Sequence, residues 1–94
     1  MEIKHVKGKK KAELLLYTLS TCGWCKKTKQ MLNSEGVAYS YIDVDLLDDE
    51  DNEKAMDEIR KWNPSCSFPT IVVNGKESIS GYKPDELRKV IADE

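Results

Sequence analysis

Residues 13–27, ELLLYTLSTCGWCKK, join a short apolar segment to a closely spaced pair of cysteines. The apolar part, residues 13–19, has the length of a strand and lacks polar alternation, which is typical of a strand covered on both faces. The segment after it, residues 23–33, carries its lysines on the outer face of a helical pattern. Cys22 and Cys25 therefore lie at a predicted strand-to-helix turn.

Local sequence signals also predict the ends of this helix and the strands and helices in the rest of the chain. Ser20 and Thr21 supply helix-capping side chains, and Gly36 is a suitable stop. Asn74-Gly75 predicts a tight hairpin. Further elements are strands at 37–44, 70–73 and 76–80, a helix at 47–62 that begins with four acidic residues, and a last helix from Pro84. The order β-α-β-α-β-β-α predicts an α/β domain with a four-stranded mixed sheet flanked by three helices.

Length and charge exclude several classes of protein. The chain has 94 residues and a formal net charge of -2, which predicts one domain and argues against nucleic acid as the main partner. Its longest apolar run, Leu14–Tyr17, is too short to span a membrane. The N-terminal residues lack the apolar core of a secretory signal. We therefore expect a soluble, cytoplasmic protein: residues 1–12 form a basic arm with a short strand at 3–6, and residues 13–94 form the domain.

Three cysteines, an odd number, do not suit a disulfide-stapled secreted scaffold. Cys22 sits at a helix start, where backbone N–H groups and the helix dipole favour the thiolate form. Cys25 lies one helical turn further in and should be more buried. We expect Cys22 to attack a disulfide and Cys25 to resolve the intermediate. A zinc site would need four ligands, and only Cys66 and His5 remain, so no metal site is predicted.

Three motifs in this order resemble those of the small glutaredoxins: residues 17–26 (YTLSTCGWCK), 67–70 (SFPT) and 80–85 (SGYKPD). The resemblance covers about residues 13 to 92 and implies the thioredoxin fold. It also implies that Cys22 is the nucleophile and Cys25 the resolving cysteine, with no bound cofactor. Pro69 matches the family's cis-proline, the residue before it presents backbone groups to a substrate, and Gly81 matches a turn that a substrate approaches. The substrate-binding residues implied are Trp24, Phe68, Pro69, Thr70, Gly81 and Tyr82.

Two departures from the family pattern concern the reductant. Leu19 stands where glutathione-binding members usually have a basic residue, and Ser80-Gly81 replaces a Gly-Gly pair. Residues 80–85 instead resemble glutaredoxin-like proteins that donate electrons to ribonucleotide reductase and draw them from a disulfide reductase. The resemblance implies a monomer that acts on disulfide-containing proteins, ribonucleotide reductase among them. A disulfide reductase, or a low-molecular-weight thiol, supplies the electrons.

Several alternatives remain open at this stage. Glutathione could still be the reductant. Gly23, where a proline is common in the family, makes a [2Fe–2S] carrier conceivable, in which Cys22 from two protomers would hold the cluster with external thiols. The Trp24 ring is either exposed beside the thiol or folded onto Tyr17 or Tyr82. Cys66 is either a small inert thiol, which we expect, or a partner in a second disulfide.

Overall fold

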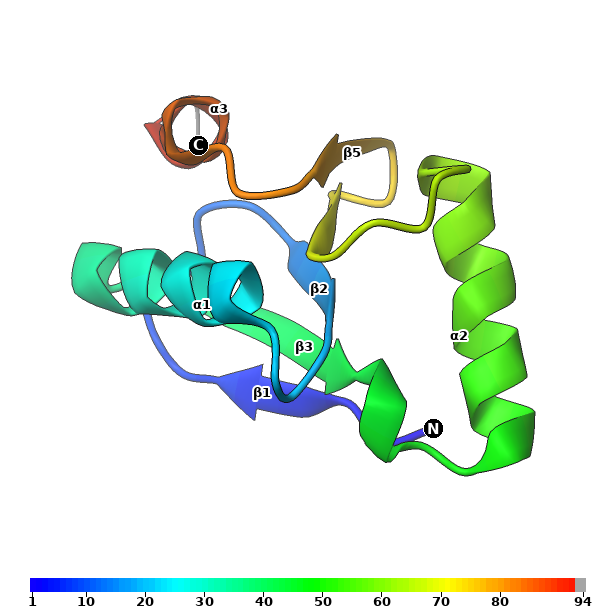
Figure 1. Cartoon of the computed structure of the whole chain (residues 1–94). Helices are drawn as coiled ribbons and strands as arrows, with labels where there is room; N and C mark the ends of the chain where they lie inside the picture. The colour runs from blue at the N-terminus through cyan, green and yellow to red at the C-terminus, as the bar shows by residue number, and fades with distance from the viewer. Residues whose placement is uncertain (93–94) are drawn as a thin grey trace.

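A mixed sheet of five strands forms the centre of the computed structural model, which describes residues 1–92 (Figure 1). The strand order is β1-β3-β2-β4-β5. Only β2 and β3 are parallel, as expected for a βαβ unit, and the other neighbouring pairs are antiparallel. The strands are β1 (Lys4–Val6), β2 (Leu14–Thr18), β3 (Tyr39–Asp43), β4 (Thr70–Val73) and β5 (Glu77–Ser80).

The described part of the chain contains three α-helices, in agreement with the prediction. They are α1 (Gly23–Glu35), α2 (Asp49–Trp62) and α3 (Pro84–Ala92), with a short 3₁₀ helix, η1 (Val44–Leu46), after β3. Gly36 stops α1 in the left-handed region at φ 69°, where its N–H bonds to the carbonyl of Asn33. No helix within residues 1–92 combines the length and apolar character needed to cross a membrane.

The expected number of strands was wrong by one, because the sheet has five strands and not four. The extra strand, β1, pairs antiparallel with β3 and comes from the basic N-terminal segment. A short strand was expected at residues 3–6, but its place in the sheet was not. Gly8 explains how the segment returns to the domain: a Cβ there would lie 2.6 Å from the backbone of Val37. The absence of a side chain allows Lys9 to exchange backbone hydrogen bonds with Gly36 and Ala38.

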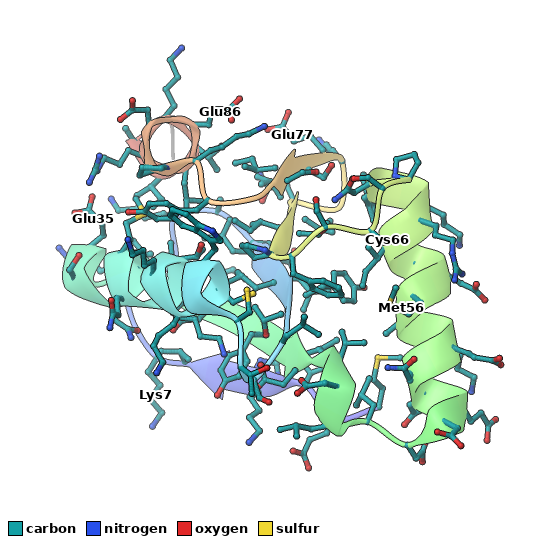
Figure 2. The ribbon with its side chains drawn as sticks, viewed as in Figure 1. Lys7, Glu35, Met56, Cys66, Glu77 and Glu86 are labelled. Carbon is teal, nitrogen blue, oxygen red and sulfur yellow. The ribbon has the colours of Figure 1, made fainter. Side chains whose placement is uncertain are left out.

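The helices cover the two faces of the sheet unequally. Helices α1 and α3 lie on one side and α2 lies on the other (Figure 1). Leu16, Leu32 and Leu87 are among the buried residues of the first layer, and Ile42 and Ile59 of the second. Met56 points from α2 toward the sheet, as its helical spacing predicted (Figure 2). This arrangement buries β2 on both faces and brings the start of α1 to the end of β2.

Candidate active site

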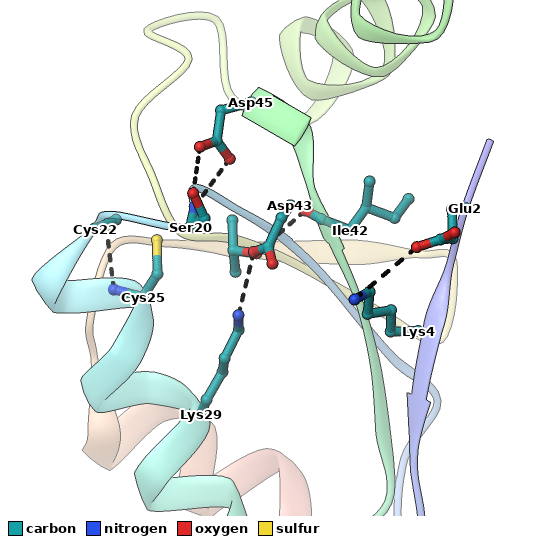
Figure 3. A network of polar contacts seen from close by, with 10 residues as sticks. Glu2, Lys4, Ser20, Cys22, Cys25, Lys29, Ile42, Asp43 and Asp45 are labelled. Carbon is teal, nitrogen blue, oxygen red and sulfur yellow. Dashed lines mark hydrogen bonds and ion pairs between the residues drawn. The ribbon is translucent and has the colours of Figure 1, made fainter. Parts of the chain in front are cut away.

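Cys22 caps the helix that follows β2. Its backbone is extended, with φ -92° and ψ 118°, and its Sγ accepts a hydrogen bond from the backbone N–H of Cys25 at 3.2 Å (Figure 3). The expected capping role of Ser20 and Thr21 was therefore wrong. The thiol takes the position in which a serine or aspartate oxygen usually satisfies the first helical N–H groups. The sulfur of Cys22 thus lies at the electropositive end of α1.

The loop before Cys22 is held by a residue distant in sequence. Asp45 in η1 accepts hydrogen bonds from the backbone N–H of Ser20, at 2.9 Å, and from the Ser20 hydroxyl (Figure 3). The same hydroxyl hydrogen bond is the main reason that the pKa of the Asp45 carboxyl is lowered. Because Ser20 is occupied by Asp45, it is not available to cap α1. Asp45 therefore fixes the approach of the chain to the nucleophile candidate.

Cys25 differs from Cys22 in burial and in ionisation. Cys25 is 1% exposed, whereas Cys22 is partly exposed. Burial first, and then a hydrogen bond with Cys22, raise the pKa of the Cys25 thiol to about 12, although the positive charge of Lys29 acts in the opposite direction. All three cysteines are free thiols. Cys25 consequently stays protonated at neutral pH, and Cys22 is the thiol that a substrate can reach.

A polar cluster that the sequence analysis missed lies next to Cys25 (Figure 3). Lys29 Nζ is 3.2 Å from Asp43 Oδ1, and the Thr18 hydroxyl donates to the same carboxylate oxygen at 2.6 Å. Lys29 also lies over the ring of Tyr41, 3.9 Å from its centre. Thr18 and Asp43 are register partners in the parallel pair β2–β3. Their positions at the ends of two predicted parallel strands were the signal that could have placed them together.

Pro69 and Gly81 lie at the same edge of the sheet as the cysteine turn. Thr70 pairs with Tyr17 near the end of β2 and with Ser80 at the end of β5, so the residues just before β4 and just after β5 meet there. The Phe68–Pro69 peptide bond is cis, as the resemblance implied. The Pro69 carbonyl accepts a hydrogen bond from the N–H of Gly81 at 2.7 Å. Two of the predicted substrate-binding segments are therefore joined directly.

The six predicted substrate-binding residues do not present their side chains equally. Thr70 is fully buried, and its hydroxyl donates to the Ser67 carbonyl at 2.8 Å, so its side chain supports the loop from inside. Pro69 is also fully buried, and Phe68 is partly buried against the cluster beneath α2. Trp24, which is 56% exposed, and Tyr82, which is partly buried, form the aromatic surface beside the dithiol.

The Trp24 ring is both exposed and stacked. Its centre lies 5.7 Å from that of Tyr82 with an interplanar angle of 25°. Of the two rings proposed to hold Trp24, Tyr82 is thus the one it contacts in the structure. Lys27 Nζ also lies over the Trp24 ring, 4.8 Å from its centre, in a cation–π contact. The stack connects the start of α1 to the loop before α3.

Cys66 lies in the loop that leaves α2 (Figure 2). It is partly buried, packs against the cluster beneath α2 and has a left-handed backbone at φ 53°. Its N–H donates to the carbonyl of Asn63 at 2.8 Å. Within residues 1–92, no three His, Cys, Asp or Glu side chains gather as a group able to hold a metal ion.

Comparison with known proteins agrees with this geometry. A family model described as Glutaredoxin matches residues 14–78. A crystal structure of a glutaredoxin from Methanosarcina mazei Go1 superposes with a TM-score of 0.88 at 42% identity, covering 97% of this chain and 88% of the other. A glutaredoxin-like 8.6 kDa protein in the rubredoxin operon of Clostridium pasteurianum is 34% identical over 81% of this chain and 93% of its own.

A third similar protein is described as glutaredoxin-like. The glutaredoxin-like protein NrdH-redoxin from Escherichia coli, whose structure is described as the basis of a thioredoxin-like activity profile, is 25% identical. It superposes with a TM-score of 0.67 over 82% of this chain and 92% of the other. The five-stranded sheet with three helices is thus a thioredoxin fold. With its close Cys22–Cys25 pair at the start of α1, the chain belongs to the glutaredoxin family of thiol–disulfide oxidoreductases.

Proposed function

We propose that this protein reduces disulfide bonds in other proteins through the Cys22-Gly23-Trp24-Cys25 motif. The observation that supports this most directly is the inequality of the two cysteines. Cys22 is partly exposed at the start of α1, and Cys25 is buried behind it with a pKa raised to about 12, mainly by that burial. Cys22 can therefore react with a substrate, while the Cys25 thiol stays protonated until the second step.

The reaction proceeds by two exchanges that conserve electrons. The Cys22 thiolate attacks one sulfur of the substrate disulfide, which forms a mixed disulfide and releases the other substrate sulfur as a thiolate. Cys25 then gives up its proton to solvent and attacks the Cys22 sulfur. This step closes the Cys22–Cys25 disulfide and releases the second substrate thiolate. Two electrons pass from the dithiol to the substrate.

The substrate lies along the edge formed by the predicted binding residues. Phe68, next to the buried Pro69, and Gly81 offer backbone groups there, and the hydrogen bond between Pro69 and Gly81 fixes their relative positions. Trp24 and Tyr82 supply an exposed aromatic surface, which suits a protein partner better than a small thiol. Thr70 contributes through its backbone position, because its side chain is buried.

We further propose that a disulfide reductase of the cytoplasm, and not glutathione, returns the electrons. Leu19 and Ser80 replace two features of a glutathione site. The similarity to NrdH-redoxin, with its thioredoxin-like activity profile, supports the same choice. Ribonucleotide reductase is then one disulfide-bearing partner consistent with the residues at 80–85. The protein needs no bound cofactor for this cycle and acts as a monomer.

A parallel reduction assay tests the proposal. The oxidised protein is incubated with NADPH and thioredoxin reductase in one arm and with glutathione, NADPH and glutathione reductase in the other. We expect faster NADPH consumption in the first arm with insulin as the disulfide substrate. Cys22→Ser serves as the inactive control. Fast turnover with glutathione and none with the reductase would contradict the choice of reductant, and no turnover in either arm would contradict the reductase function itself.

A further inference from the structure

Beside the aromatic stack lies a groove that shares only Tyr82 with the substrate-binding edge proposed above. It is open, has a volume of about 470 Å³ and runs between α1 and α3. Two of its lining residues, Lys27 and Arg88, are cationic, and none is acidic. The lining residues are Lys27, Gln30, Met31, Ser34, Tyr82 and Arg88. This groove is distinct from the edge formed by Phe68, Pro69 and Gly81.

The α1 side of the groove is a single helical face. Lys27, Gln30, Met31 and Ser34 follow one another at i, i+3, i+4 and i+7, which places them in line along about two turns. Two turns span roughly 10 Å, the length of about three residues of extended chain. Gln30 offers hydrogen-bonding groups, and the Ser34 hydroxyl, which donates to the Met31 carbonyl at 2.8 Å, can still accept a hydrogen bond. Met31 is buried and contributes only a small apolar part of the lining. The dimensions and chemistry fit a short extended peptide.

The groove is continuous with the site of thiol exchange. Tyr82 lines the groove and also stacks on Trp24, which lies between Cys22 and Cys25 in the motif. A chain joined to Cys22 by a mixed disulfide can therefore pass over the stack and enter the groove within a few residues. Lys27 stands at this junction, because its Nζ lies 4.8 Å from the centre of the Trp24 ring.

The cations of the groove are free to meet an incoming carboxylate. Within residues 1–92, Lys27 makes no ion pair. Among the residues that the structure describes, Arg88 pairs only with Asp85, at 3.5 Å, and the Asp85 side chain is fully exposed. Such exposed pairs are weak, so another carboxylate can compete for Arg88. The nearby Glu86 lines a separate hollow with Glu77. The protein as a whole has a net negative charge, so an acidic segment should favour this local positive surface over the rest of the molecule.

We propose that the groove between α1 and α3 binds an acidic, extended segment next to the disulfide of the partner protein. This inference rests on the proposed disulfide reductase function and adds a substrate class to it. Lys27 and Arg88 select carboxylates, while Gln30 and Ser34 contact the backbone of the bound segment. The electron transfer is the two-step exchange already described.

Three synthetic peptides test this proposal. Each contains the same intramolecular disulfide, flanked on both sides by three glutamates, three glutamines or three lysines. The pre-reduced protein is mixed with each peptide and the reaction is quenched with acid. The reduced and oxidised forms of the peptide are then separated and quantified, because the exchange leaves the total number of thiols unchanged. We expect the second-order rate constant to be about five-fold higher for the Glu peptide than for the Gln peptide and lowest for the Lys peptide. The preference should shrink in 0.5 M NaCl, because the screening length there is roughly three-fold shorter than at low salt.

The variants isolate the groove from the dithiol. In Lys27→Gln/Arg88→Gln, the Glu-to-Gln rate ratio should fall to about one. The ratio cancels any general change in the reactivity of Cys22. Arg60→Gln on α2 is the matched control, because Arg60 forms the same i,i+3 pair with an aspartate on the other side of the sheet. A wild-type ratio near one, or a ratio that persists in the double variant, would overturn the proposal.

A binding measurement separates failure of the groove from failure of the reductase. A Glu peptide with serines in place of its cysteines is titrated into the ¹⁵N-labelled protein. We expect the amide signals of Gln30, Ser34 and Tyr82 to shift, and the Gln peptide to shift them less. If the wild type reduces no peptide but these signals move, the reductase function fails and the groove stands. If the peptides are reduced but the signals stay still, the groove proposal fails alone.

Discussion

The backbone N–H of Cys25 donates a hydrogen bond to the sulfur of Cys22 across 3.2 Å. The bond makes Cys22 the cap of α1 and places its sulfur in the positive electrostatic potential of the helix N-terminus. The thiol of Cys25 is buried and held in the protonated form. The two sulfurs of the motif are therefore unequal before any substrate arrives.

Alkylation should reveal this inequality. With limiting iodoacetamide at about pH 6–7, below the ordinary pKa of a free thiol, Cys22 should be labelled well ahead of Cys25 and Cys66. The reason is the exposure of Cys22 at the helix start together with the burial of Cys25. Peptide mass spectrometry at increasing times gives the order. Earlier labelling of Cys25 would reverse the assigned roles, and the Cys22→Ser variant provides the slow reference.

The raised pKa of Cys25 predicts a loss of stability in alkaline solution. The folded state keeps the Cys25 proton up to about pH 12, whereas an unfolded thiol loses it near 9.0. The burial of the neutral thiol therefore stabilises the reduced protein fully below pH 9, and this contribution falls as the pH rises from there. Urea unfolding under reducing conditions at pH 8 to 10.5 measures it.

Comparison with Cys25→Ser isolates the contribution of this thiol. Tyr17 and Tyr39, whose pKa values are also raised by burial, titrate in both proteins and cancel in the difference. The free energy of unfolding should fall more steeply with pH in the wild type, by at most about 1.4 kcal/mol per pH unit. Parallel curves for the two proteins would show that Cys25 titrates normally.

Most of the architecture could be predicted from the sequence because its signals are local. The strand predicted at 13–19 is observed as β2, and the predicted stop of α1 at Gly36 and turn at Asn74-Gly75 are confirmed. Each of these signals depends on neighbouring residues. Strand β1 could not be assigned to the sheet in the same way. It has three mostly exposed residues, and its stability comes from pairing with β3, about 35 residues away along the chain.

The candidate site shows the same division between local and distant information. The positions of Cys22 and Cys25 follow from the motif, and the cis bond before Pro69 follows from the family resemblance. The hydrogen bonds that Asp45 accepts from Ser20 join residues 25 positions apart, and no local sequence pattern predicts them. Because Ser20 has this distant partner, the ordinary capping rule assigned it the wrong role.

Lys29 should stabilise both the fold and the second step of the reaction. Its amino group pairs with the Asp43 carboxylate, whose side chain is only 13% exposed and also accepts from Thr18. Lys29→Met leaves that carboxylate without its cation and should cost about 1–3 kcal/mol in urea unfolding. Lys61→Met, which breaks an exposed pair with Glu58, should stay within about 0.5 kcal/mol of the wild type.

The catalytic effect of Lys29 is separate from its effect on stability. Its positive charge lowers the pKa of Cys25, so its removal makes the resolving thiolate scarcer. In Lys29→Met, the mixed disulfide of Cys22 with a small aromatic thiol should decay several-fold more slowly near neutral pH. The difference should narrow as the pH rises and Cys25 ionises in both proteins. An unchanged decay rate would limit Lys29 to a structural role.

Asp45 should hold the backbone of the loop before Cys22 in place while contributing little to overall stability. Asp45→Ala removes two hydrogen bonds to Ser20 and should lower the free energy of unfolding by at most about 1 kcal/mol. Since the pKa of Asp45 is lowered in the folded state, its contribution is present above the ordinary carboxyl pKa and is lost as the pH falls through the folded value. Unfolding at pH 7 and pH 3 should therefore show a smaller difference in acid. Asp57→Ala, on the exposed face of α2, is the control.

Cys66 should be dispensable for catalysis, although its backbone is unusual. Its φ of 53° lies in the left-handed region, which costs a side-chain-bearing residue about 1–2 kcal/mol. Cys66→Ser keeps that conformation and should retain most disulfide reductase activity, with at most about 1–2 kcal/mol lost from packing against the cluster beneath α2. Cys66→Gly relieves the backbone and should be at least as stable as Cys66→Ser. Mass spectrometry of the oxidised wild type decides the redox role: a Cys22–Cys25 bond with free Cys66 is expected, and a substantial population of any bond to Cys66 would contradict it.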